Sequence, residues 1–393
     1  MKTNNNIPSY RFQGYTDAWE LRKLGEFVDK AVDNRGKTPP LDEEGTHPLI
    51  EVAALGGVHP DYTKIDKYLN DESFENNLRS YIKKDDILFT TVGSIGLVSL
   101  MDSREEAAIA QNIVAFRAKD NFVPSYLYSL FTNKENQLKA IRIVMGAVQP
   151  SIKVSQLVDV EYMLTQNRFE QKAIGTFFST LDRQITLHQR KLDTLKEQKK
   201  TYLKLLFPAK GQTKPALRFQ GFEDDWEEVK LSDMILHEIK GKAKSEMLGS
   251  SAVYLETEYL NGGTKSFVDC EKDVEEDDIL ILWDGSQAGT VYHGFSGALG
   301  STLKAYRPKE SGKFIYYQLV SHQNLIFEKY RTPNIPHVIK TFTDEFHMFY
   351  TSHPEQEAIG SFFQTLDQEI SQVEDKLASL KEMKKTLLRK LFV

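Results

Sequence analysis

The sequence predicts an α+β protein in which two related globular modules are joined by two long helices that form an antiparallel coiled coil. Three observations lead to this prediction. A 37-residue stretch occurs twice, each copy has the apolar spacing of a coiled coil, and the segment that leads into each module is repeated as well. A duplicated module followed by a duplicated helix predicts two halves related by a pseudo-two-fold axis.

The repeated stretch covers residues 171–207 and returns at 356–392, with 21 of the 37 positions identical. Its apolar residues advance in alternating steps of four and three. This average of 3.5 residues is the seam of a coiled coil, not the broader stripe of a surface helix. Two such seams in one chain most simply bury each other. The seam residues are Ile174, Phe178, Leu181, Ile185, Leu192 and Leu195 in the first copy, and Ile359, Phe363, Leu366, Ile370, Leu377 and Leu380 in the second.

Each long helix has recognisable ends. A capping pattern, Asn or Ser followed three residues later by Glu, opens each helix and offers acceptors to the free N–H groups of the first turn. Pro208 stops the first helix. At 1.5 Å per residue each helix is expected to be roughly 57 Å long. The capping pairs are Asn167 with Glu170 and Ser352 with Glu355, and the expected helices are residues 166–207 and 351–393.

Two seam lysines, Lys199 and Lys384, favour an antiparallel pair. In a parallel, in-register pair they would face each other across the seam, where like charges repel. In an antiparallel pair each lies near a leucine layer of the other helix, and its amine can reach solvent. The alternative is that the two helices are unrelated and that each lies on its own module.

Composition limits the class of protein. The 393 residues allow two or three domains, and 40% hydrophobic with 27% charged residues is ordinary for a globular protein. The net charge of −6 gives no general attraction to nucleic acid, so DNA binding would need locally basic surfaces. With the single Cys270, a disulfide framework and a cysteine-rich metal site are excluded, and the nine histidines show no metal-ligand spacing.

The sequence shows no targeting signal that we recognise. The polar amino-terminal residues lack the apolar core of a signal peptide, and no run approaches 18 apolar residues. We therefore expect a cytoplasmic protein that makes no contact with a membrane.

The module ahead of each helix is duplicated as well. Residues 8–24 match 215–231 at 10 of 17 positions, and both contain RFQG and a Trp-Glu pair. Shorter landmarks follow in the same order: a glycine between basic residues, an Asp-Asp pair leading a strand into a Gly-Ser turn, a polar turn before a strand, and a segment just ahead of the helix. These landmarks are residues 33–39, 85–94, 109–119 and 147–154 in the first half, and 238–244, 277–286, 299–309 and 334–341 in the second.

Between the landmarks the two modules diverge. Residues 41–74 have no counterpart that can be aligned within 245–270. Because the helices agree while the loops differ, the sequence predicts one scaffold that presents two different binding surfaces. The expected domains are residues 1–165 (first module), 166–207 (central helix), 208–350 (linker and second module) and 351–393 (carboxy-terminal helix).

This order of segments resembles the DNA-specificity subunit of type I restriction–modification systems. The resemblance is carried by two RFxGF-like segments, RFQGY and RFQGF, and by the helix sequences EQKAIGTFFSTLD and EQEAIGSFFQTLD, and it covers nearly the whole chain. It implies that the modules are target-recognition domains, each reading half of a split, asymmetric DNA sequence, on helices that fix their separation. One departure is visible: TQNRFEQ opens the first helix where such subunits usually have a proline-rich PxxEQ, and we interpret it as a local change of cap.

The resemblance also implies partners. They are double-stranded DNA, two methyltransferase (modification) subunits docked on the helices, and restriction/translocase subunits. No cofactor is expected in this chain; S-adenosylmethionine, ATP and Mg²⁺ are expected on the partner subunits. The assembled complex would be an adenine-specific DNA methyltransferase and an ATP-dependent endonuclease, in which this chain is not the enzyme.

A module that reads DNA needs cations for phosphates, and amide, hydroxyl or guanidinium groups for base edges. Such residues gather at the shared landmarks and differ between the halves, as two different half-sites would require. A glycine between the basic residues would let the backbone approach a phosphate. The candidates are Arg35, Lys37, Thr91, Ser94, Gln111, Asn112, Gln149 and Ser151 in the first module, and Lys240, Lys242, Lys244, Trp283, Ser286, Gln287, Ser301, Thr302, Asn334 and His337 in the second.

Plainer interpretations stand beside these. Basic residues around a glycine also occur in solvated loops, and a Gly-Ser turn can be an ordinary hairpin turn. The aromatic residues Trp19 and Trp226 are expected to pack each module against the scaffold. The Lys-Lys pairs at 199–200 and 384–385 are expected to be solvated edges of the seam, with contact to a partner as the alternative.

Catalytic signatures are missing from the sequence. It contains no GxxxxGK[ST] phosphate loop, no FxGxG-type cofactor loop and no Asn/Asp-Pro-Pro-Tyr/Phe tetrapeptide. A nuclease-like set of Asp225, Glu238 and Lys240 has only Asp33-x-Arg35 as its counterpart in the first half, and we reject it. Two rivals to DNA recognition are kept for testing: a protein-interaction scaffold, supported only by the acidic net charge, and a cryptic nuclease, supported only by the pattern of Glu238 and Lys240.

Overall fold

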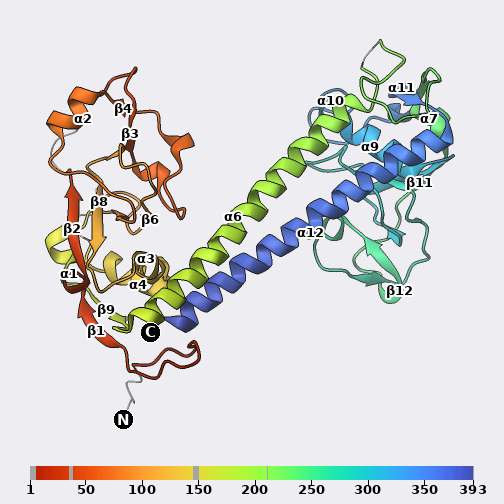
Figure 1. Ribbon diagram of the computed structural model, residues 1–393. Helices are drawn as coiled ribbons and strands as arrows, with labels where there is room; N and C mark the ends of the chain where they lie inside the picture. Colours follow the sequence, from red (N-terminus) through yellow and green to blue (C-terminus); the bar gives the residue numbers. More distant parts are fainter. Residues whose placement is uncertain (1–5, 35–38, 145–149, 210, 393) are drawn as a thin grey trace. The chain divides into compact units, whose positions relative to one another are not determined.

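The computed structural model describes residues 6–34, 39–144, 150–209 and 211–392 (Figure 1). By their contacts the residues fall into two compact units. The first consists of Met1–Gln189 with Asp375–Val393, and the second of Arg190–Glu374. Each unit contains one module and a stretch of both long helices. The four-part division expected from the sequence groups residues differently, and its boundaries stay a prediction.

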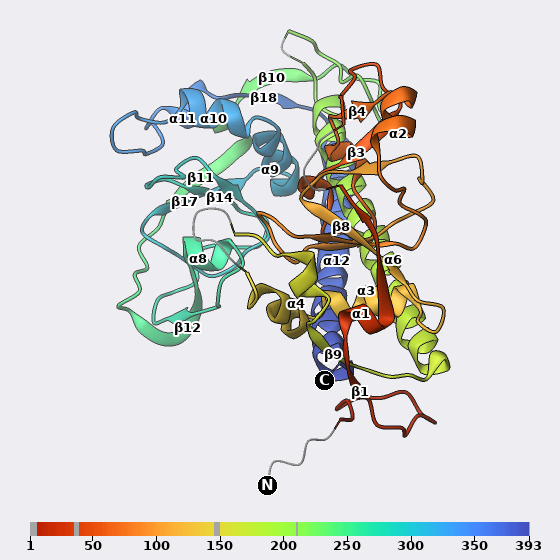
Figure 2. The same ribbon diagram turned by 90° about the vertical axis from the view of Figure 1, so that its left-hand side faces the viewer.

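The two long helices are α6 (Arg168–Leu205) and α12 (His353–Leu391). In Figures 1 and 2 they lie side by side. In the first unit Asp182, early in α6, pairs with Lys384, late in α12. In the second unit the order is reversed, because Lys199 from the end of α6 pairs with Asp367 from the start of α12. The antiparallel coiled coil predicted from the sequence is therefore confirmed within each unit.

The seam residues predicted from the sequence face into this pairing. Only Ile185 is half-buried, and the others are at most 8% exposed. The heptad spacing is therefore used as expected, with one apolar layer of each helix covering the other. The buried members are Ile174, Phe178, Leu181, Leu192, Leu195, Ile359, Phe363, Leu366, Ile370, Leu377 and Leu380.

The two seam lysines do not extend their amines into solvent as the sequence suggested. Lys384 Nζ lies 2.5 Å from Oδ1 of Asp182, and Lys199 Nζ lies 2.5 Å from Oδ1 of Asp367. The lysine side chains are only 21% and 22% exposed. Each lysine is therefore neutralised across the seam by an aspartate of the other helix, and the expectation of a solvated amine was wrong.

An arginine of each RFQG segment holds the start of a long helix. Arg11 donates two hydrogen bonds to Glu170, at 2.6 and 2.8 Å, and Arg218 binds Glu355 in the same way at 2.7 and 2.8 Å. Asn167 does cap α6, since its Oδ1 accepts from two backbone N–H groups of the first turn. The two glutamates of the predicted capping pattern, however, bind arginine side chains, which corrects their expected role.

The first module combines a four-stranded sheet, in the order β2-β8-β5-β6, with a three-stranded sheet, β4-β3-β7. Helix α3 packs against β6 and β8 of the larger sheet, and Figure 1 shows α3 and α4 next to the ends of the long helices. Asn133 Nδ2 donates to the Leu388 carbonyl of α12 at 2.8 Å. The elements are β1 (Glu20–Lys23), α1 (Leu24–Phe27), β2 (Val28–Asp33), β3 (His47–Ile50), the 3₁₀ turns η1 (Val52–Ala54) and η2 (Tyr62–Lys64), β4 (Tyr68–Leu69), α2 (Asp71–Asn77), β5 (Ile87–Thr90), β6 (Val98–Leu100), β7 (Ala108–Ile109), β8 (Ile113–Ala118), α3 (Pro124–Thr132), α4 (Lys134–Ile141), α5 (Val154–Leu157) and β9 (Glu161–Leu164).

The second module repeats this topology. Its larger sheet has the order β11-β17-β14-β15 and its smaller sheet the order β13-β12-β16, with one parallel pair in each smaller sheet. The elements are β10 (Glu227–Lys230), α7 (Leu231–Met234), β11 (Ile235–Lys240), β12 (Leu248–Leu255), α8 (Thr257–Leu260), β13 (Phe267–Val268), β14 (Ile279–Leu282), β15 (Val291–Tyr292), β16 (Ala298–Leu299), β17 (Leu303–Pro308), α9 (Gly312–Ser321), α10 (Gln323–Lys329), α11 (Phe342–Glu345) and β18 (His347–Tyr350).

Both faces of each larger sheet are covered, which explains its apolar central strands. In β5 the side chains of Ile87 and Phe89 enter one core, while Leu88 between them enters another. Successive residues of a strand point to opposite faces, so a strand buried on both sides must be apolar throughout. Strand β14 does the same with Ile281 and Leu280.

Each module is closed by pairing its first strand with its last. Strand β1 pairs antiparallel with β9, and β10 pairs antiparallel with β18. Beside these pairs the buried Trp19 lies 5.9 Å from Phe392, and Trp226 lies 6.3 Å from Phe207, measured between ring centroids. The two tryptophans therefore pack the modules onto the helices, as the sequence predicted. Among the described residues, no helix combines the length and the apolar character that crossing a membrane would require.

Residues 41–74, which have no aligned counterpart in sequence, do have a structural counterpart in the second module. Residues 41–74 contain β3 and β4, and these strands occupy the places of β12 and β13 in the other module. The connections differ, with two 3₁₀ turns between β3 and β4 and the short helix α8 between β12 and β13. The two modules therefore share a strand topology and differ in the connections between the strands.

Candidate nucleic-acid interface

Three of the sequence landmarks meet at one end of the larger sheet in the first module. The backbone N–H of Thr91 donates to the Asn112 carbonyl at 2.8 Å, and the N–H of Ile152 donates to the Thr91 carbonyl at 2.8 Å. The Gly93 N–H lies 3.4 Å from the Pro150 carbonyl. The Gly-Ser turn after β5, the turn before β8 and the segment ahead of α5 are thus held together by backbone hydrogen bonds.

The same three hydrogen bonds recur in the second module. The N–H of Trp283 donates to Thr302 O at 2.8 Å, and the Gly285 N–H donates to Pro336 O at 3.0 Å. The N–H of Val338 returns a bond to Trp283 O at 2.9 Å. Segments that are far apart in sequence are therefore brought together at equivalent places, and we call each group a three-segment cluster.

Several side chains of the first cluster are open to solvent. Ser94 and Gln111 are exposed, while Asn112 and Ser151 are half-buried. Thr91 is fully buried, and its hydroxyl donates to the Asn112 carbonyl at 3.2 Å. It therefore braces the turn from inside and does not present its hydroxyl at the surface.

Three of the candidates, Arg35, Lys37 and Gln149, lie outside the described residues. Their proposed contacts with DNA stay predictions. The described neighbour Asn34 is buried, and its Nδ2 donates to the Ile109 carbonyl at 3.1 Å.

The basic segment of the second module borders its cluster. Lys240, Lys242 and Lys244 are all exposed. The backbone between them is fixed to the turn before β17, because the Ser301 N–H donates to the Ala243 carbonyl at 3.0 Å. The exposed lysines therefore lie in a segment next to the turn that carries the exposed Ser301 and Thr302.

Gly241, between two of these lysines, is required for a different reason from the one predicted. A Cβ atom at this position would lie 1.9 Å from the carbonyl oxygen of Gly300. No side chain fits there, so the glycine lets two segments of the same module approach each other. The approach of a phosphate to this segment stays a prediction.

Lys304 was not among the residues predicted for the site. Its Nζ lies 3.4 Å from the ring centroid of Trp283 and 2.7 Å from a carboxylate oxygen of Glu238. A lysine over an indole ring is held by the negative face of the aromatic system. One face of Trp283 is thus already occupied, which leaves less of this ring for a base than the sequence suggested. The only sequence signal was the cationic residue beside the turn before β17.

The remaining members of the second cluster form a braced loop. Arg331, also missed, donates to the Ser286 carbonyl at 3.3 Å. The half-buried His337 has its Nδ1 at 3.0 Å from the Thr332 hydroxyl. Ser286, Gln287 and Asn334 are exposed around this frame. These three side chains can offer hydroxyl and amide groups outward without local rearrangement.

At the other end of the same two strands from each cluster, an aspartate with a buried carboxylate pairs with a half-exposed arginine. The carboxylate of Asp86 accepts two hydrogen bonds from Arg117, at 2.8 and 2.7 Å, and Asp278 accepts two from Arg307, at 2.8 and 2.6 Å. Both carboxylates are at most 1% exposed. Bidentate pairs fix direction as well as distance, so they set the strands that lead into both Gly-Ser turns.

The rejected nuclease-like set is divided by the structure. Glu238 is paired with Lys304, whereas Asp225 is paired with Lys214 at 2.9 Å. Within the described parts of the chain, no group of three or more His, Cys, Asp or Glu side chains could hold a metal ion. The arrangement offers hydrogen-bonding and cationic groups for recognition.

Comparison with known proteins adds a family to this geometry. A protein-family model described as "Type I restriction modification DNA specificity domain" matches residues 16–197 and again 223–382. The two matches cover most of the chain and place one such domain in each half.

Individual relatives agree. The type I restriction enzyme MjaVIII specificity subunit of Methanocaldococcus jannaschii is 31% identical over 180 residues, which are 43% of this chain and 42% of that protein. A Mycoplasma genitalium protein named as type I specificity subunit S.MgeORF438P is 23% identical over 399 residues, 100% of this chain and 96% of its own. The crystal structure of an S subunit of a type I restriction–modification system from M. genitalium shares the fold, with a TM-score of 0.71 at 21% identity, covering 98% of this chain and 99% of that one.

Proposed function

The chain belongs to the family of type I restriction–modification DNA-specificity subunits, and we propose that each of its modules reads one half of a bipartite, asymmetric DNA target. One observation carries this proposal. The two three-segment clusters have the same backbone hydrogen bonds but expose different side chains. Two modules that bind different half-sites need the same backbone arrangement with different exposed side chains.

The exposed groups divide naturally between the two kinds of DNA contact. Lys240, Lys242 and Lys244 are suited to phosphates, which give affinity without sequence information. The amides of Gln287 and Asn334 are suited to base edges, where an amide can bond adenine in two places. The chain has a net charge of −6, so these local lysines carry the attraction that the whole chain lacks.

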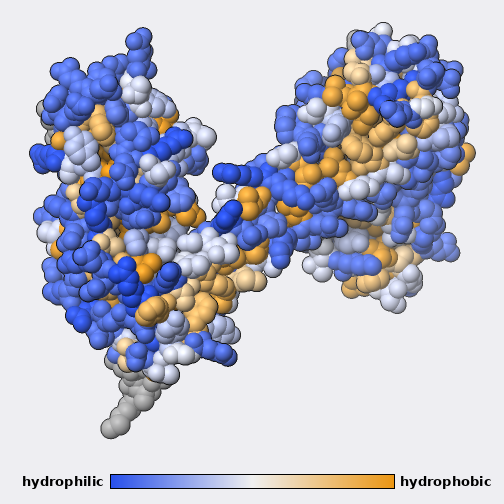
Figure 3. All heavy atoms as spheres, in the orientation of Figure 1, coloured by the Kyte–Doolittle hydropathy of each residue, from blue (hydrophilic) through white to orange (hydrophobic). Residues whose placement is uncertain are grey.

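The long helices serve in this proposal as the spacer and as the docking surface for two methyltransferase subunits. Figure 3 shows hydrophobic side chains along the helices on an otherwise largely hydrophilic surface. Within the first unit, Leu187 of α6 is 47% exposed and Met383 of α12 is 46% exposed, outside the seam. Apolar side chains left uncovered on long helices favour a protein partner.

The remaining parts of the activity would come from the partners. Methyltransferase subunits would carry S-adenosylmethionine and methylate adenine, and restriction/translocase subunits would carry ATP and Mg²⁺. The specificity subunit itself supplies the choice of DNA sequence. A role of this kind places the complex in the cytoplasm, where the DNA is.

A module exchange tests the two-reader proposal. Residues 21–165 are replaced by the same region of a relative, and the target of the assembled methyltransferase is determined from the adenines it methylates in a genome. We expect one half of the target to change and the other half to remain, because the second module and both helices are untouched. A change in both halves, or in neither, would overturn the proposal.

Salt dependence separates this function from the protein-interaction scaffold. Each phosphate contact releases counterions, so DNA affinity falls steeply as salt rises. The assembled complex is therefore expected to bind its target strongly at low salt and much less at high salt. DNA binding that is absent in the assembled complex would favour the scaffold instead.

A further inference from the structure

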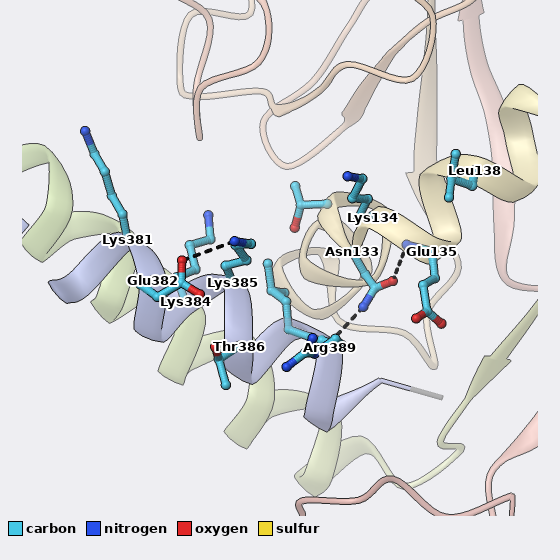
Figure 4. Close-up of a pocket in the computed structure, with 12 residues that line it drawn as sticks. Asn133, Lys134, Glu135, Leu138, Lys381, Glu382, Lys384, Lys385, Thr386 and Arg389 are labelled. Atoms are coloured by element: carbon cyan, nitrogen blue, oxygen red, sulfur yellow. Dashed lines mark hydrogen bonds and ion pairs between the residues drawn. The ribbon is translucent and has the colours of Figure 1, made fainter. Parts of the chain in front are cut away.

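A pocket of about 500 Å³ lies within the first unit, between α4 and the carboxy-terminal part of α12 (Figure 4). Its cationic lining consists of Lys134 from α4 and of Lys381, Lys384, Lys385 and Arg389 from α12. Two glutamates, Glu135 and Glu382, also line it. In a chain with a net charge of −6, this is a local concentration of positive charge.

The cations differ in how far they are already neutralised. Lys384 pairs with Asp182, and Lys385 pairs with Glu382 at 3.2 Å. Lys381 donates to the neutral amide oxygen of Gln189 at 3.3 Å, and no ion pair joins it to the other residues that the structure describes. Within the described residues, neither Lys134 nor Arg389 has an ion-pair partner. Three cations around the pocket are thus left for an external anion.

The internal repeat shows that one of these cations, Lys381, differs from its counterpart in the second unit. In the second unit Lys191 pairs with Glu369 at 2.7 Å, and Lys196 pairs with Glu374 at 2.6 Å. The repeat places Gln184 and Gln189 where those two glutamates stand, and Lys381 where Lys196 stands. The position of Lys381 is therefore neutralised across the helix pair in the second unit, whereas in the first unit a neutral glutamine faces it.

Helix α4 connects the pocket to the first three-segment cluster. Helix α4 lines the pocket with Lys134 and Leu138, and its Gln137 donates to the Gly96 carbonyl, just after the Gly-Ser turn, at 3.2 Å. One helix, roughly 10 Å across, therefore separates the cationic pocket from the candidate DNA-reading turn. A polyanion that contacts the turn can extend to the pocket without leaving the unit.

We propose that this pocket binds backbone phosphates of the DNA that continues beyond the first module's half-site, through Lys134, Lys381 and Arg389. Lysine and arginine at a phosphate backbone give affinity without reading bases. The contact would hold the DNA next to the helix pair on one side of the target only. This inference rests on the proposed function, because it takes for granted that the first module is bound to its half-site.

The test uses the assembled methyltransferase complex and two matched double variants. Lys381→Gln with Arg389→Gln removes two of the unneutralised cations. Lys191→Gln with Lys196→Gln removes two lysines that are already paired. Affinity for the target duplex is measured between 50 and 200 mM salt. Because the logarithmic salt slope is about 0.9 per phosphate contact, the first variant should lose roughly tenfold less affinity over this range than the wild type. The second variant should keep the wild-type slope.

A second measurement locates the contact. Single phosphates outside the half-site are replaced by neutral methylphosphonates, one linkage at a time. At one or two linkages the wild-type complex should lose affinity, and the Lys381→Gln/Arg389→Gln complex should not. Base preferences within both half-sites should be the same in the variant, since a phosphate contact carries no sequence information.

Three outcomes oppose the inference. Weaker assembly with methyltransferase and an unchanged salt slope would show that the pocket takes an acidic protein segment instead of DNA. An unchanged slope with normal assembly would show a solvated surface. Specific DNA binding persists in both of these cases, so the proposed function survives them. A complex without any sequence-specific DNA binding would instead refute the proposed function itself.

Discussion

Lys384 on α12 is bound to Asp182 on α6 at 2.5 Å, and the residues that repeat them, Lys199 and Asp367, are bound to each other in the second unit. The two pairs are not equally satisfied. Asp367 Oδ2 also accepts a hydrogen bond from the Tyr317 hydroxyl at 2.8 Å. Among the described residues, Asp182 Oδ2 has no hydrogen-bond partner. The repeat thus contains two versions of the same contact, and the one with the more buried carboxylate has one oxygen without a hydrogen-bond partner in the described part of the chain.

The first prediction concerns the pair in the first unit. Asp182→Leu leaves Lys384 without its anion in a mostly buried place, and we expect a loss of about 1–3 kcal/mol in the free energy of unfolding. Adding Lys384→Met should recover most of this loss, because an apolar pair can replace a buried ion pair. Denaturant unfolding of all three proteins measures both values. Equal stability of the single and double variants would contradict the pairing.

The second prediction concerns pH. Burial raises the pKa of Asp182 above its usual value of 3.8, and Lys384 offsets part of that rise. At pH values between the pKa of Asp182 in the unfolded chain and its higher pKa in the folded protein, the folded protein binds more protons. The resulting stabilisation is complete below the unfolded-state pKa and is lost as the pH rises through the folded-state pKa. The stability of the wild type relative to Asp182→Asn should therefore increase as pH falls from 7 towards 4. A difference that is flat over this range would refute the assignment.

The third prediction concerns the arginine that holds the start of α12. Arg218→Lys keeps the charge but cannot form both hydrogen bonds to Glu355, whose side chain is 1% exposed. We expect a loss of about 1–3 kcal/mol and faster hydrogen exchange in the first turns of α12. The control is Lys214→Gln, which breaks the exposed pair with Asp225 and should cost less than about 1 kcal/mol. Similar effects of the two substitutions would contradict the prediction.

The fourth prediction separates base contacts from phosphate contacts in the second module. Gln287→Ala should weaken binding at one target position by about 1–3 kcal/mol if the amide reads a base. Lys242→Ala should weaken binding to all sequences alike and reduce the salt slope by about one. The measurement is the affinity of the assembled methyltransferase for duplexes varied one base pair at a time, at two salt concentrations. A uniform effect of Gln287→Ala would exclude it as a base reader.

The parts of the fold that could be predicted are those that the sequence repeats. The heptad seam, the RFQG segments and the order of landmarks each occur in both halves, so the helices and the two related modules follow from pattern alone. The partners of the seam lysines did not follow. Asp182 lies just outside the seam, and only the register of the antiparallel pair brings it to Lys384. The sequence of one helix suggested a solvated lysine amine, but an aspartate of the other helix neutralises it.

The candidate site was predictable by segment but not by side chain. The landmarks recurred in order, and the structure brings them together in both modules. Whether a residue points outward depends on local hydrogen bonds, and Thr91 is buried because its hydroxyl binds the Asn112 carbonyl. Lys304 looked like an ordinary exposed residue of a strand, and its place over Trp283 depends on how β17 lies beside β14. Strands such as β4 and β13, two residues each, are too short to leave a periodic signal.

The pairing of first and last strands gives each module the geometry of a cassette. The chain enters through β1 or β10 and leaves through β9 or β18, directly beside the point of entrance and a few residues before a long helix begins. A gene segment that encodes everything between those strands can be exchanged with one from another locus while both junctions stay in place. If each module reads one half of the target, as proposed, recombination would create a new DNA target in a single step and leave both long helices unchanged.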